Sequence, residues 1–293
     1  MRRRFVDTVE SLMASDDRVI VLLGDIGVHS FRQAFAHHPG RVYNLGICVQ
    51  SMIGVAAGMA REGFVPIVHS IAPFVVERCY EQLKIDFAYQ ALGGNIVSVG
   101  ASYDYAMLGA THHCPADVAV LRGIPGVEVV VPGTPQEFDA LFRASYDNGH
   151  LTYFRLSERS NDRTIDVAWG KAKRMRQGAD ATVLCVGPTL GAVMAAVEGL
   201  DVEVLYFTTL APFDSEALRS SSASRKIVVV EPFYRGSLAT DICESLPGQC
   251  IETTWLGVPR EFVRQYGSCD DHDGLSGLTP AAIRSVVLEV VHA

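Results

Sequence analysis

The stretch Asn44-Leu45-Gly46-Ile47-Cys48-Val49-Gln50-Ser51-Met52-Ile53-Gly54-Val55-Ala56-Ala57-Gly58 decides the fold. After Gly46 its apolar side chains recur at helical spacing, at Val49, Met52, Ile53, Ala56 and Ala57. Gly54 and Gly58 lie one turn apart, where glycine lowers helix propensity but lets another backbone approach closely. The pattern therefore predicts a buried helix pressed against a second large surface.

Apolar runs before and after this helix alternate with segments of helical period. The predicted strands are 18–23, 64–69, 95–100, 127–131 and 152–156, and the predicted helices are 5–13, 77–91 and 135–146. A long loop, 101–115, follows the third strand. Alternating strands and helices predict a layered α/β domain with a mainly parallel sheet.

A second α/β pattern begins after a polar stretch, 157–178, which reads as a linker with a short β excursion. Its predicted strands are 181–186, 202–206 and 226–230, its predicted helices are 190–198, 237–245 and 279–291, and the serines at 220–224 predict a turn. We therefore expect two layered α/β domains with mainly parallel sheets, over residues 1–160 and 178–293.

Composition limits the classes of partner. The 293 residues are 48% hydrophobic and 20% charged, as in a soluble globular protein, and the net charge of −8 argues against nucleic acid or an anionic membrane as the partner. No apolar core of a signal peptide follows the basic start, and we find no run of bilayer-spanning length, so we expect a cytoplasmic location and no membrane partner. The seven cysteines contain no Cys-x-x-Cys pair, which excludes a zinc module of that kind.

Four motifs in order resemble one enzyme family. The pattern Asn44-x-Gly46-Ile47-x-x-Gln50, followed by a small-residue helix, resembles the start of the pyrimidine-binding domain of thiamine-diphosphate enzymes, specifically transketolases. The further matching stretches are Phe74…Arg78-Cys79-Tyr80-Glu81-Gln82, Gly109-Ala110-Thr111-His112-His113 and Leu121-Arg122-Gly123-Ile124-Pro125. The last domain, with Glu231 and Gly236-Ser237-Leu238, resembles the transketolase C-terminal domain.

The resemblance implies a split enzyme. Full-length transketolases carry an N-terminal domain that binds the diphosphate and its metal ion, and the motifs of this chain correspond to the part that follows it. It is thus identified as the β subunit of a heteromeric enzyme with a separate α subunit, and an α2β2 assembly is expected. Thiamine diphosphate would lie in the α–β crevice with its pyrimidine on this chain, and Mg²⁺ would be held mainly by the partner.

The resemblance also implies roles for individual residues. His112 would be catalytic, because imidazole exchanges protons near neutral pH and donates hydrogen bonds to a developing oxyanion. The implied cofactor-binding residues are Val49, Gln50, Phe74 and Arg78, and the implied substrate residues are His113, Leu108 and Arg159. Ring stacking on Phe74 would contribute roughly 0.5–1.5 kcal/mol beyond burial, although Phe74 also suits a core position. No metal site is expected, because no spaced ligand joins His112-His113-Cys114.

Departures from the family pattern predict an unusual donor. Val49 stands where the family has the glutamate that bonds the aminopyrimidine, Gly100 where it has a histidine, and Leu108 where it has a substrate-binding aspartate. A sugar hydroxyl buried against apolar surface without a partner costs about 1–3 kcal/mol. Ketose phosphates are therefore poor candidates as donors.

Two polar positions near the expected site have open roles. Asp104 reads as a solvated loop residue, with substrate contact as the alternative. The local alignment puts Glu158 at the position of the family's phosphate-binding arginine, and Arg159 is the expected substitute, with a surface salt bridge as the alternative.

Three functions remain open from the sequence. The first hypothesis is a thiamine-diphosphate-dependent transferase that moves a two-carbon ketol or acyl unit from an unusual donor to an acceptor carbonyl. The second is a 2-oxo-acid dehydrogenase-type β subunit that decarboxylates and transfers an acyl group. The third is a non-catalytic structural or regulatory subunit. The Thr-His sequence and the Arg-Cys-Tyr-Glu-Gln stretch favour the first.

Overall fold

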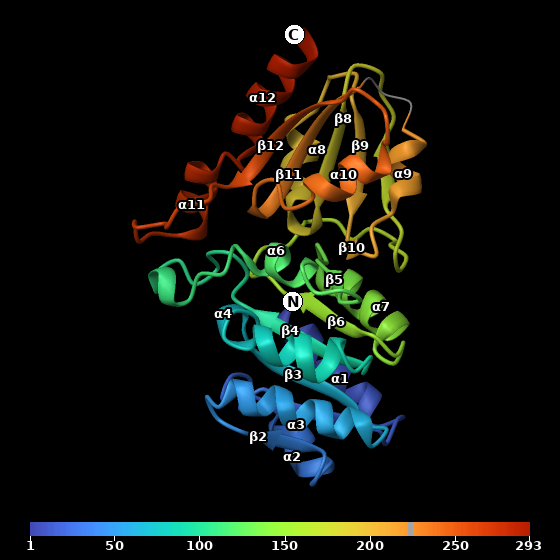
Figure 1. Cartoon of the computed structure of the whole chain (residues 1–293). Coiled ribbons are helices and arrows are strands. Elements are labelled where there is room, and N and C mark those ends of the chain that lie inside the picture. The colour runs from blue at the N-terminus through green and yellow to red at the C-terminus, as the bar shows by residue number, and fades with distance from the viewer. Residues whose placement is uncertain (222–224) are drawn as a thin grey trace.

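The computed structural model describes residues 1–221 and 225–293. They form two layered α/β units, one from each half of the chain, which lie one above the other in Figure 1. Within the described residues, the strands assemble into a seven-stranded sheet of order β10-β5-β6-β4-β3-β1-β2 and a five-stranded sheet of order β12-β11-β8-β9-β7. All strand pairs are parallel except β10 with β5 and β7 with β9. The predicted α/β class with mainly parallel sheets is confirmed. The predicted turn at 220–224 includes residues 222–224, which lie outside the described residues.

The strands of the first sheet are mostly the apolar runs that the sequence marks. Its strands are β1 (Val19–Leu23), β2 (Val42–Asn44), β3 (Val65–Ile71), β4 (Gly94–Val99), β5 (Glu128–Val130), β6 (Leu151–Arg155) and β10 (Thr209–Ala211). The second sheet contains β7 (Lys173–Arg176), β8 (Thr182–Val186), β9 (Glu203–Phe207), β11 (Lys226–Tyr234) and β12 (Glu252–Val258). Strand β7 is the predicted β excursion, whereas β2, β10 and β12 were not predicted.

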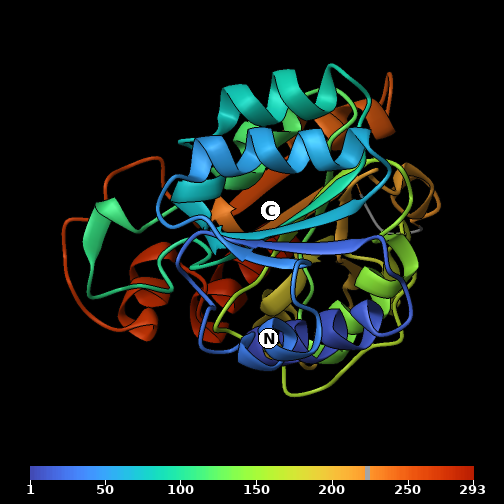
Figure 2. The ribbon, with the colours of Figure 1, turned by 90° about the horizontal axis from the view of Figure 1, so that it is seen from below.

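Helices cover both faces of the first sheet (Figure 2). The helices of this half are α1 (Arg2–Met13), α2 (Arg32–His37), α3 (Val49–Arg61), α4 (Ala72–Val75), α5 (Tyr80–Gln82), the π-helix η1 (Leu83–Ala88), the 3₁₀-helix η2 (Gly109–Thr111), α6 (Asp117–Arg122) and α7 (Pro135–Ser145). Those that follow are the 3₁₀-helix η3 (Gly187–Thr189), α8 (Leu190–Ala196), α9 (Ser215–Arg219), α10 (Ala239–Ser245), α11 (Cys269–Ser276) and α12 (Pro280–His292).

Helix α3 buries the side chains that its period predicts. They are Val49, Met52, Ile53, Ala56 and Ala57. The expectation that another backbone packs on its glycines is not met within the chain. A Cβ on Gly58 would meet no described atom within 4 Å, and a Cβ on Gly54 would meet only Asp86 Oδ2 at 3.6 Å. The glycine face of α3 is therefore open.

The predicted helix over 77–91 is wrong in its extent. Helix α4 ends at Val75, and turns occupy residues 76–79. The Arg78 amide donates to the Pro73 carbonyl (3.2 Å) and the Cys79 thiol to the Phe74 carbonyl (3.1 Å). These local bonds compete with helical ones, so α5 begins only at Tyr80 and continues as the π-helix η1.

Strand β10 links the two halves. Residues Thr209–Ala211 belong to the later half but pair antiparallel with β5 at the edge of the first sheet. The division into 1–160 and 178–293 did not anticipate this exchange. One hydrophobic cluster also continues from the first sheet into the second, through Val129 and Val131 to Leu184 and Leu205.

One helical stretch among the described residues, Cys269–His292, has the length and hydropathy of a membrane span, contrary to our expectation from the sequence. This stretch is not one continuous helix. Gly277 adopts a left-handed conformation after α11, and Thr279 caps a new helix, α12. Ile283, Val287 and Val290 of α12 pack into the core of the second half, as in a globular protein.

A buried arginine joins the end of β6 to the second half. Arg155 is 1% exposed, and its Nε donates to Asp117 Oδ2 at 2.7 Å. Its Nη2 donates to Ser102 Oγ (2.6 Å) and to the Pro232 carbonyl (3.3 Å). Tyr153 Oη donates to the same Asp117 oxygen (2.8 Å). One guanidinium therefore binds the loop after β4, helix α6 and strand β11.

Asp104 fixes the loop after β4, contrary to the prediction of a solvated side chain. It is buried, and its carboxylate accepts hydrogen bonds from the Ala101 amide, the Ser157 hydroxyl and the Glu158 amide, each at 3.0 Å. Burial raises the pKa of Asp104 from 3.8 to about 6, because desolvation outweighs these bonds. The residue thus ties the loop to the segment after β6.

Removal of the Arg155 charge is expected to destabilise the fold strongly. In Arg155→Met, Asp117 stays buried without its cation, which costs about 3–5 kcal/mol of unfolding free energy. Arg18→Met is the control, because Arg18 is 51% exposed in its pair with Asp16 and such pairs contribute about 0–1 kcal/mol. Urea unfolding followed by circular dichroism measures both. Equal small losses would contradict the proposed importance of the buried pair.

Asp104 is expected to make stability depend on pH. A raised carboxyl pKa means that its contribution is complete below 3.8 and is lost as the pH rises through about 6. Between pH 5 and 7 the wild type should therefore lose roughly 1 kcal/mol more stability than Asp104→Asn, which does not titrate. Denaturation midpoints at both pH values test this. Parallel pH profiles for the two proteins would count against the assignment.

Candidate functional site

The candidate site lies at the carboxyl ends of the parallel strands, where open α/β sheets bind ligands. Three connections meet there. Helix α3 starts after β2, helix α4 follows β3, and the site loop, which we define as residues 100–115, follows β4. Helices α3 and α4 are in contact, and their side chains share one apolar cluster.

Val49 and Gln50 occupy the first turn of α3. Val49 is 3% exposed and belongs to the cluster that contains Val75 and Val76, whereas Gln50 is exposed. The start of α3 is thus aliphatic where the resemblance implies contact with a pyrimidine, but the Val49 side chain is covered by its neighbours in this chain.

Phe74, Arg78 and His112 come together. The centroids of the Phe74 and His112 rings are 5.7 Å apart, tilted by 54°. The Arg78 guanidinium carbon lies 3.8 Å from the centroid of the Phe74 ring, a cation–π geometry. Phe74 is only partly buried, so its role is not confined to the core. Arg78 is exposed, and its side chain is therefore free to move aside for a flat ligand.

His112 follows η2 and is partly buried. Its ring also lies 6.0 Å from that of Tyr105, in an edge-to-face arrangement. The Thr111 hydroxyl is 2.9 Å from His112 Nδ1 and 3.3 Å from the Leu108 carbonyl. These contacts hold the ring through Nδ1. Nε2 is then the nitrogen available to a ligand or a reacting group.

The His113 side chain does not join the Phe74–His112 contact and lies in a different, buried cluster. It is buried, its Nε2 lies 3.3 Å from the Tyr105 carbonyl, and burial lowers its pKa. Its ring meets that of His272 at 5.7 Å, and His272 meets Tyr103 at 5.1 Å. His113 is thus part of a buried aromatic cluster that the sequence did not reveal.

The space that a side chain at residue 100 would need is occupied by the ring of Tyr105. Gly100 has φ +79°, and a Cβ built on it would lie 2.5 Å from Tyr105 Cε2. The space that a histidine would use is therefore filled by Tyr105. Leu108 is 50% exposed and presents an aliphatic side chain beside it. Both observations agree with a site whose polar contacts differ from the family pattern.

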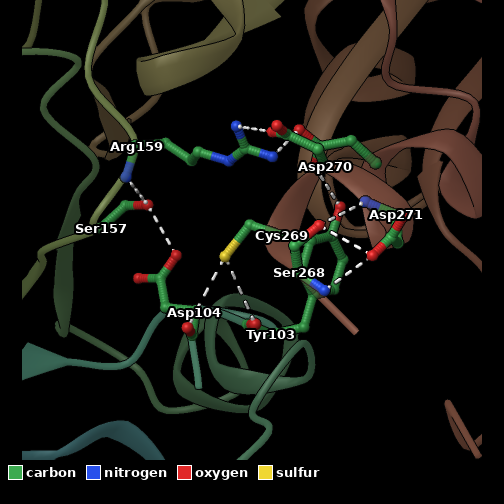
Figure 3. A network of polar contacts seen from close by, with 9 residues as sticks. Tyr103, Asp104, Ser157, Arg159, Ser268, Cys269, Asp270 and Asp271 are labelled. Carbon is green, nitrogen blue, oxygen red and sulfur yellow. Dashed lines mark hydrogen bonds and ion pairs between the residues drawn. The ribbon is translucent and has the colours of Figure 1, made fainter. Parts of the chain in front are cut away.

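Arg159 is held by two carboxylates of α11 (Figure 3). Its Nη1 donates to Asp270 at 2.7 Å, and its Nη2 forms an ion pair with Asp273. The alternative of a salt bridge is therefore the observed one. Asp270 and Asp273 lie more than a hundred residues after Arg159 in the sequence. The acidic run that contains them is the one sequence feature that could have indicated a partner for this arginine.

Metal-binding groups are absent from the described part of the chain. Residues 1–221 and 225–293 contain no group of three or more histidine, cysteine, aspartate or glutamate side chains that could hold a metal ion.

Comparisons with known proteins agree with the fold and the motifs. The family model described as transketolase, pyrimidine binding domain, matches residues 1–162, and the model described as transketolase, C-terminal domain, matches residues 170–283.

The chain is 39% identical over 287 residues to an uncharacterized 33.6 kDa protein in the fasciation locus of Rhodococcoides fascians (97% of this chain, 92% of that one). It is 30% identical over 303 residues to the 6-deoxy-6-sulfo-D-fructose transketolase subunit SqwH of Clostridium sp. strain MSTE9 (99% of this chain, 94% of that one).

A solved structure titled split gene transketolase, inactive beta4 tetramer, has a similar fold. It superposes with a TM-score of 0.87 at 22% identity, over 99% of this chain and 97% of that one. Together the two family models cover most of the chain in the order that the motifs indicated. The chain belongs to the transketolase family and combines its pyrimidine-binding and C-terminal domains.

Proposed function

We propose that the chain is the β subunit of a split, thiamine-diphosphate-dependent transketolase-like enzyme. It transfers a two-carbon unit from an unusual donor to an acceptor carbonyl. The contact between Phe74 and His112 at the carboxyl edge of the first sheet carries this proposal, because it joins an aromatic surface to a proton-transferring group. The SqwH relative is named a transketolase subunit, which supports a heteromeric enzyme.

The residues at the site fit the pyrimidine of thiamine diphosphate. A flat ring needs an aromatic neighbour on an apolar base, and Phe74 offers one because it packs on the apolar cluster that contains Val49. Gln50 is exposed at the same helix start, and the exposed Arg78 guanidinium would leave the Phe74 ring when a flat ligand stacks there. When bound, the cofactor supplies the carbanion chemistry that the side chains lack. Mg²⁺ would be held mainly by the partner subunit.

His112 is the group of this chain that handles protons. Thr111 fixes its Nδ1, so Nε2 is directed to the reacting carbonyl, where it donates a hydrogen bond or transfers a proton. The tilted Phe74 and Tyr105 rings restrict the imidazole on two sides. In the overall reaction one carbon–carbon bond of the donor breaks and one forms to the acceptor, so no external oxidant is required.

An α subunit completes the site. The open glycine face of α3 is suited to close contact with another backbone. The solved structure with a similar fold is titled split gene transketolase, inactive beta4 tetramer, and we propose that this β chain needs its α subunit for activity. We propose an α2β2 assembly.

The donor differs from a ketose phosphate in this proposal. Tyr105 fills the space beside Gly100, and Leu108 offers no hydrogen bond from its side chain to a sugar hydroxyl. An unpaired hydroxyl buried there costs about 1–3 kcal/mol.

Two-carbon transfer by the assembled complex tests the proposal. The chain is combined with the candidate α subunit, thiamine diphosphate and Mg²⁺, and products from a donor panel are measured by mass spectrometry. His112→Asn should lower turnover by roughly 10²–10⁴-fold with cofactor binding preserved, because a general acid–base group is lost. His113→Asn is the control and should retain more than a tenth of the activity. A cofactor-loaded complex without turnover on any donor would support the non-catalytic alternative.

Val49→Glu tests whether the lost family glutamate alone explains the altered donor. The new carboxyl would be buried among aliphatic side chains, which raises its pKa and lowers stability. We expect altered cofactor binding but no ordinary transketolase activity with a ketose phosphate. Val49→Gln, an uncharged control of similar size, separates charge from volume. Recovery of that activity by Val49→Glu alone would refute a remodelled donor site.

A further inference from the structure

An apolar slot lies between the site loop and a segment of the second half. We define the slot by Tyr105, Ala106, Met107 and Leu108 on one side and by Tyr266 and Cys269 on the other. It is an open cavity of about 810 Å³, within the range of small-molecule sites. Met107, Leu108 and Tyr266 are all substantially exposed in it. Exposed apolar side chains in an open cavity beside the residues that hold His112 make the slot a candidate ligand site.

One wall of the slot comes from the second half of the chain. A Cβ on Gly109 would lie 3.3 Å from Tyr266 Cε1, so the tyrosine ring rests against the glycine of the site loop. The Cys269 thiol reaches the carbonyls of Tyr103 (3.8 Å) and Asp104 (3.6 Å), and Tyr103 Oη donates to Asp273 (2.6 Å). Figure 3 shows the Cys269 thiol directed at the main chain of Tyr103 and Asp104. The second half of the chain therefore shapes the approach to the site.

The slot adjoins the residues that hold the His112 ring. Leu108, which lines it, accepts a hydrogen bond from Thr111 through its carbonyl, and the same hydroxyl contacts His112 Nδ1. Tyr105 lines the slot and also lies edge-on to the His112 ring. A group bound in the slot would thus contact the two residues, Tyr105 and Leu108, that border the His112 segment.

The charges around the slot disfavour a phosphate. Its lining contains Asp104 and Glu158 but no basic residue among the described ones. Arg159, the nearest candidate in sequence, is engaged by Asp270 and Asp273, so its positive charge is neutralised within the protein. A phosphate dianion would meet two carboxylates and aliphatic carbon in the lining, while the N-terminal ammonium and Arg2 act on Asp104, Glu158 and Tyr105 from outside it.

We infer that the slot binds an uncharged apolar group, an aliphatic chain or an aromatic ring, of an unphosphorylated acceptor aldehyde. This rests on the proposed function. Leu108 and Tyr266 determine this specificity through contact with the apolar group. The aspartates of α11 contribute indirectly, because they keep Arg159 from acting as a phosphate anchor.

Two unreactive probes test binding without turnover. Titration calorimetry of the α–β complex compares 2-phenylethanol with glycerol 3-phosphate. We expect 2-phenylethanol to bind at least tenfold more tightly, and Leu108→Asp and Tyr266→Ser each to weaken it roughly tenfold. Phe262→Ser is the matched control, because Phe262 is 73% exposed, like Tyr266, but lies outside the slot. The affinity of this variant complex for 2-phenylethanol should be unchanged. Equal or tighter binding of glycerol 3-phosphate would overturn the inference.

Release of Arg159 provides a gain-of-binding test. Asp270→Asn with Asp273→Asn should raise the affinity for glycerol 3-phosphate roughly tenfold, and adding Arg159→Met should abolish the gain. No gain in the double variant would show that the aspartates are not what excludes phosphate.

Turnover separates the inference from the proposed function. Two-carbon transfer to glycolaldehyde establishes the function, and preference for phenylacetaldehyde over glyceraldehyde 3-phosphate supports the slot. Transfer to glycolaldehyde with no such preference would overturn the slot alone. Amide hydrogen exchange with and without the α subunit supplies the remaining check. If α binding protects residues 105–108 and 266–269 and the complex binds no probe, this surface belongs to the partner subunit and the inference is overturned.

Discussion

The buried ion pair between Arg155 and Asp117 is the constraint on which the candidate site depends. The carboxylate is removed from water together with the guanidinium, so each compensates the desolvation of the other. The remaining donors of Arg155 reach Ser102 and the Pro232 carbonyl, which belong to the site loop and to β11. Chain segments far apart in sequence are thereby fixed at the carboxyl edge of the first sheet.

The site is built outward from this pair in steps. Asp104 ties the site loop to the segment after β6, and the loop then places His112 against Phe74. Helix α11 closes the other side through Arg159 and Tyr103. Rigid elements therefore hold the aromatic surface, while the loop and α11 define what approaches it. This division is common in enzymes whose scaffold is shared but whose substrates differ.

The sequence predicts what depends on local period and fails where partners are distant. The buried face of α3 and the central strands follow from apolar spacing alone. Asp104 was misjudged because a carboxyl in a polar loop looks solvated until Ser157 and the Glu158 amide are placed beside it. The capture of Arg159 required contacts across more than a hundred residues. Strand β10 was missed because three residues carry too little pattern to mark an edge strand.

Strand exchange at β10 also bears on how such a chain can be divided during evolution. The edge of β5 is covered by residues of the second half, which the ribosome adds after every other strand of the first sheet, so the first sheet is finished late. A chain broken between the halves would leave an uncovered strand edge that invites aggregation. A gene break before α1 keeps β5 and β10 in one chain, whereas a break between the two domains would leave the edge of β5 uncovered. The two domains are therefore expected to be inherited as one unit.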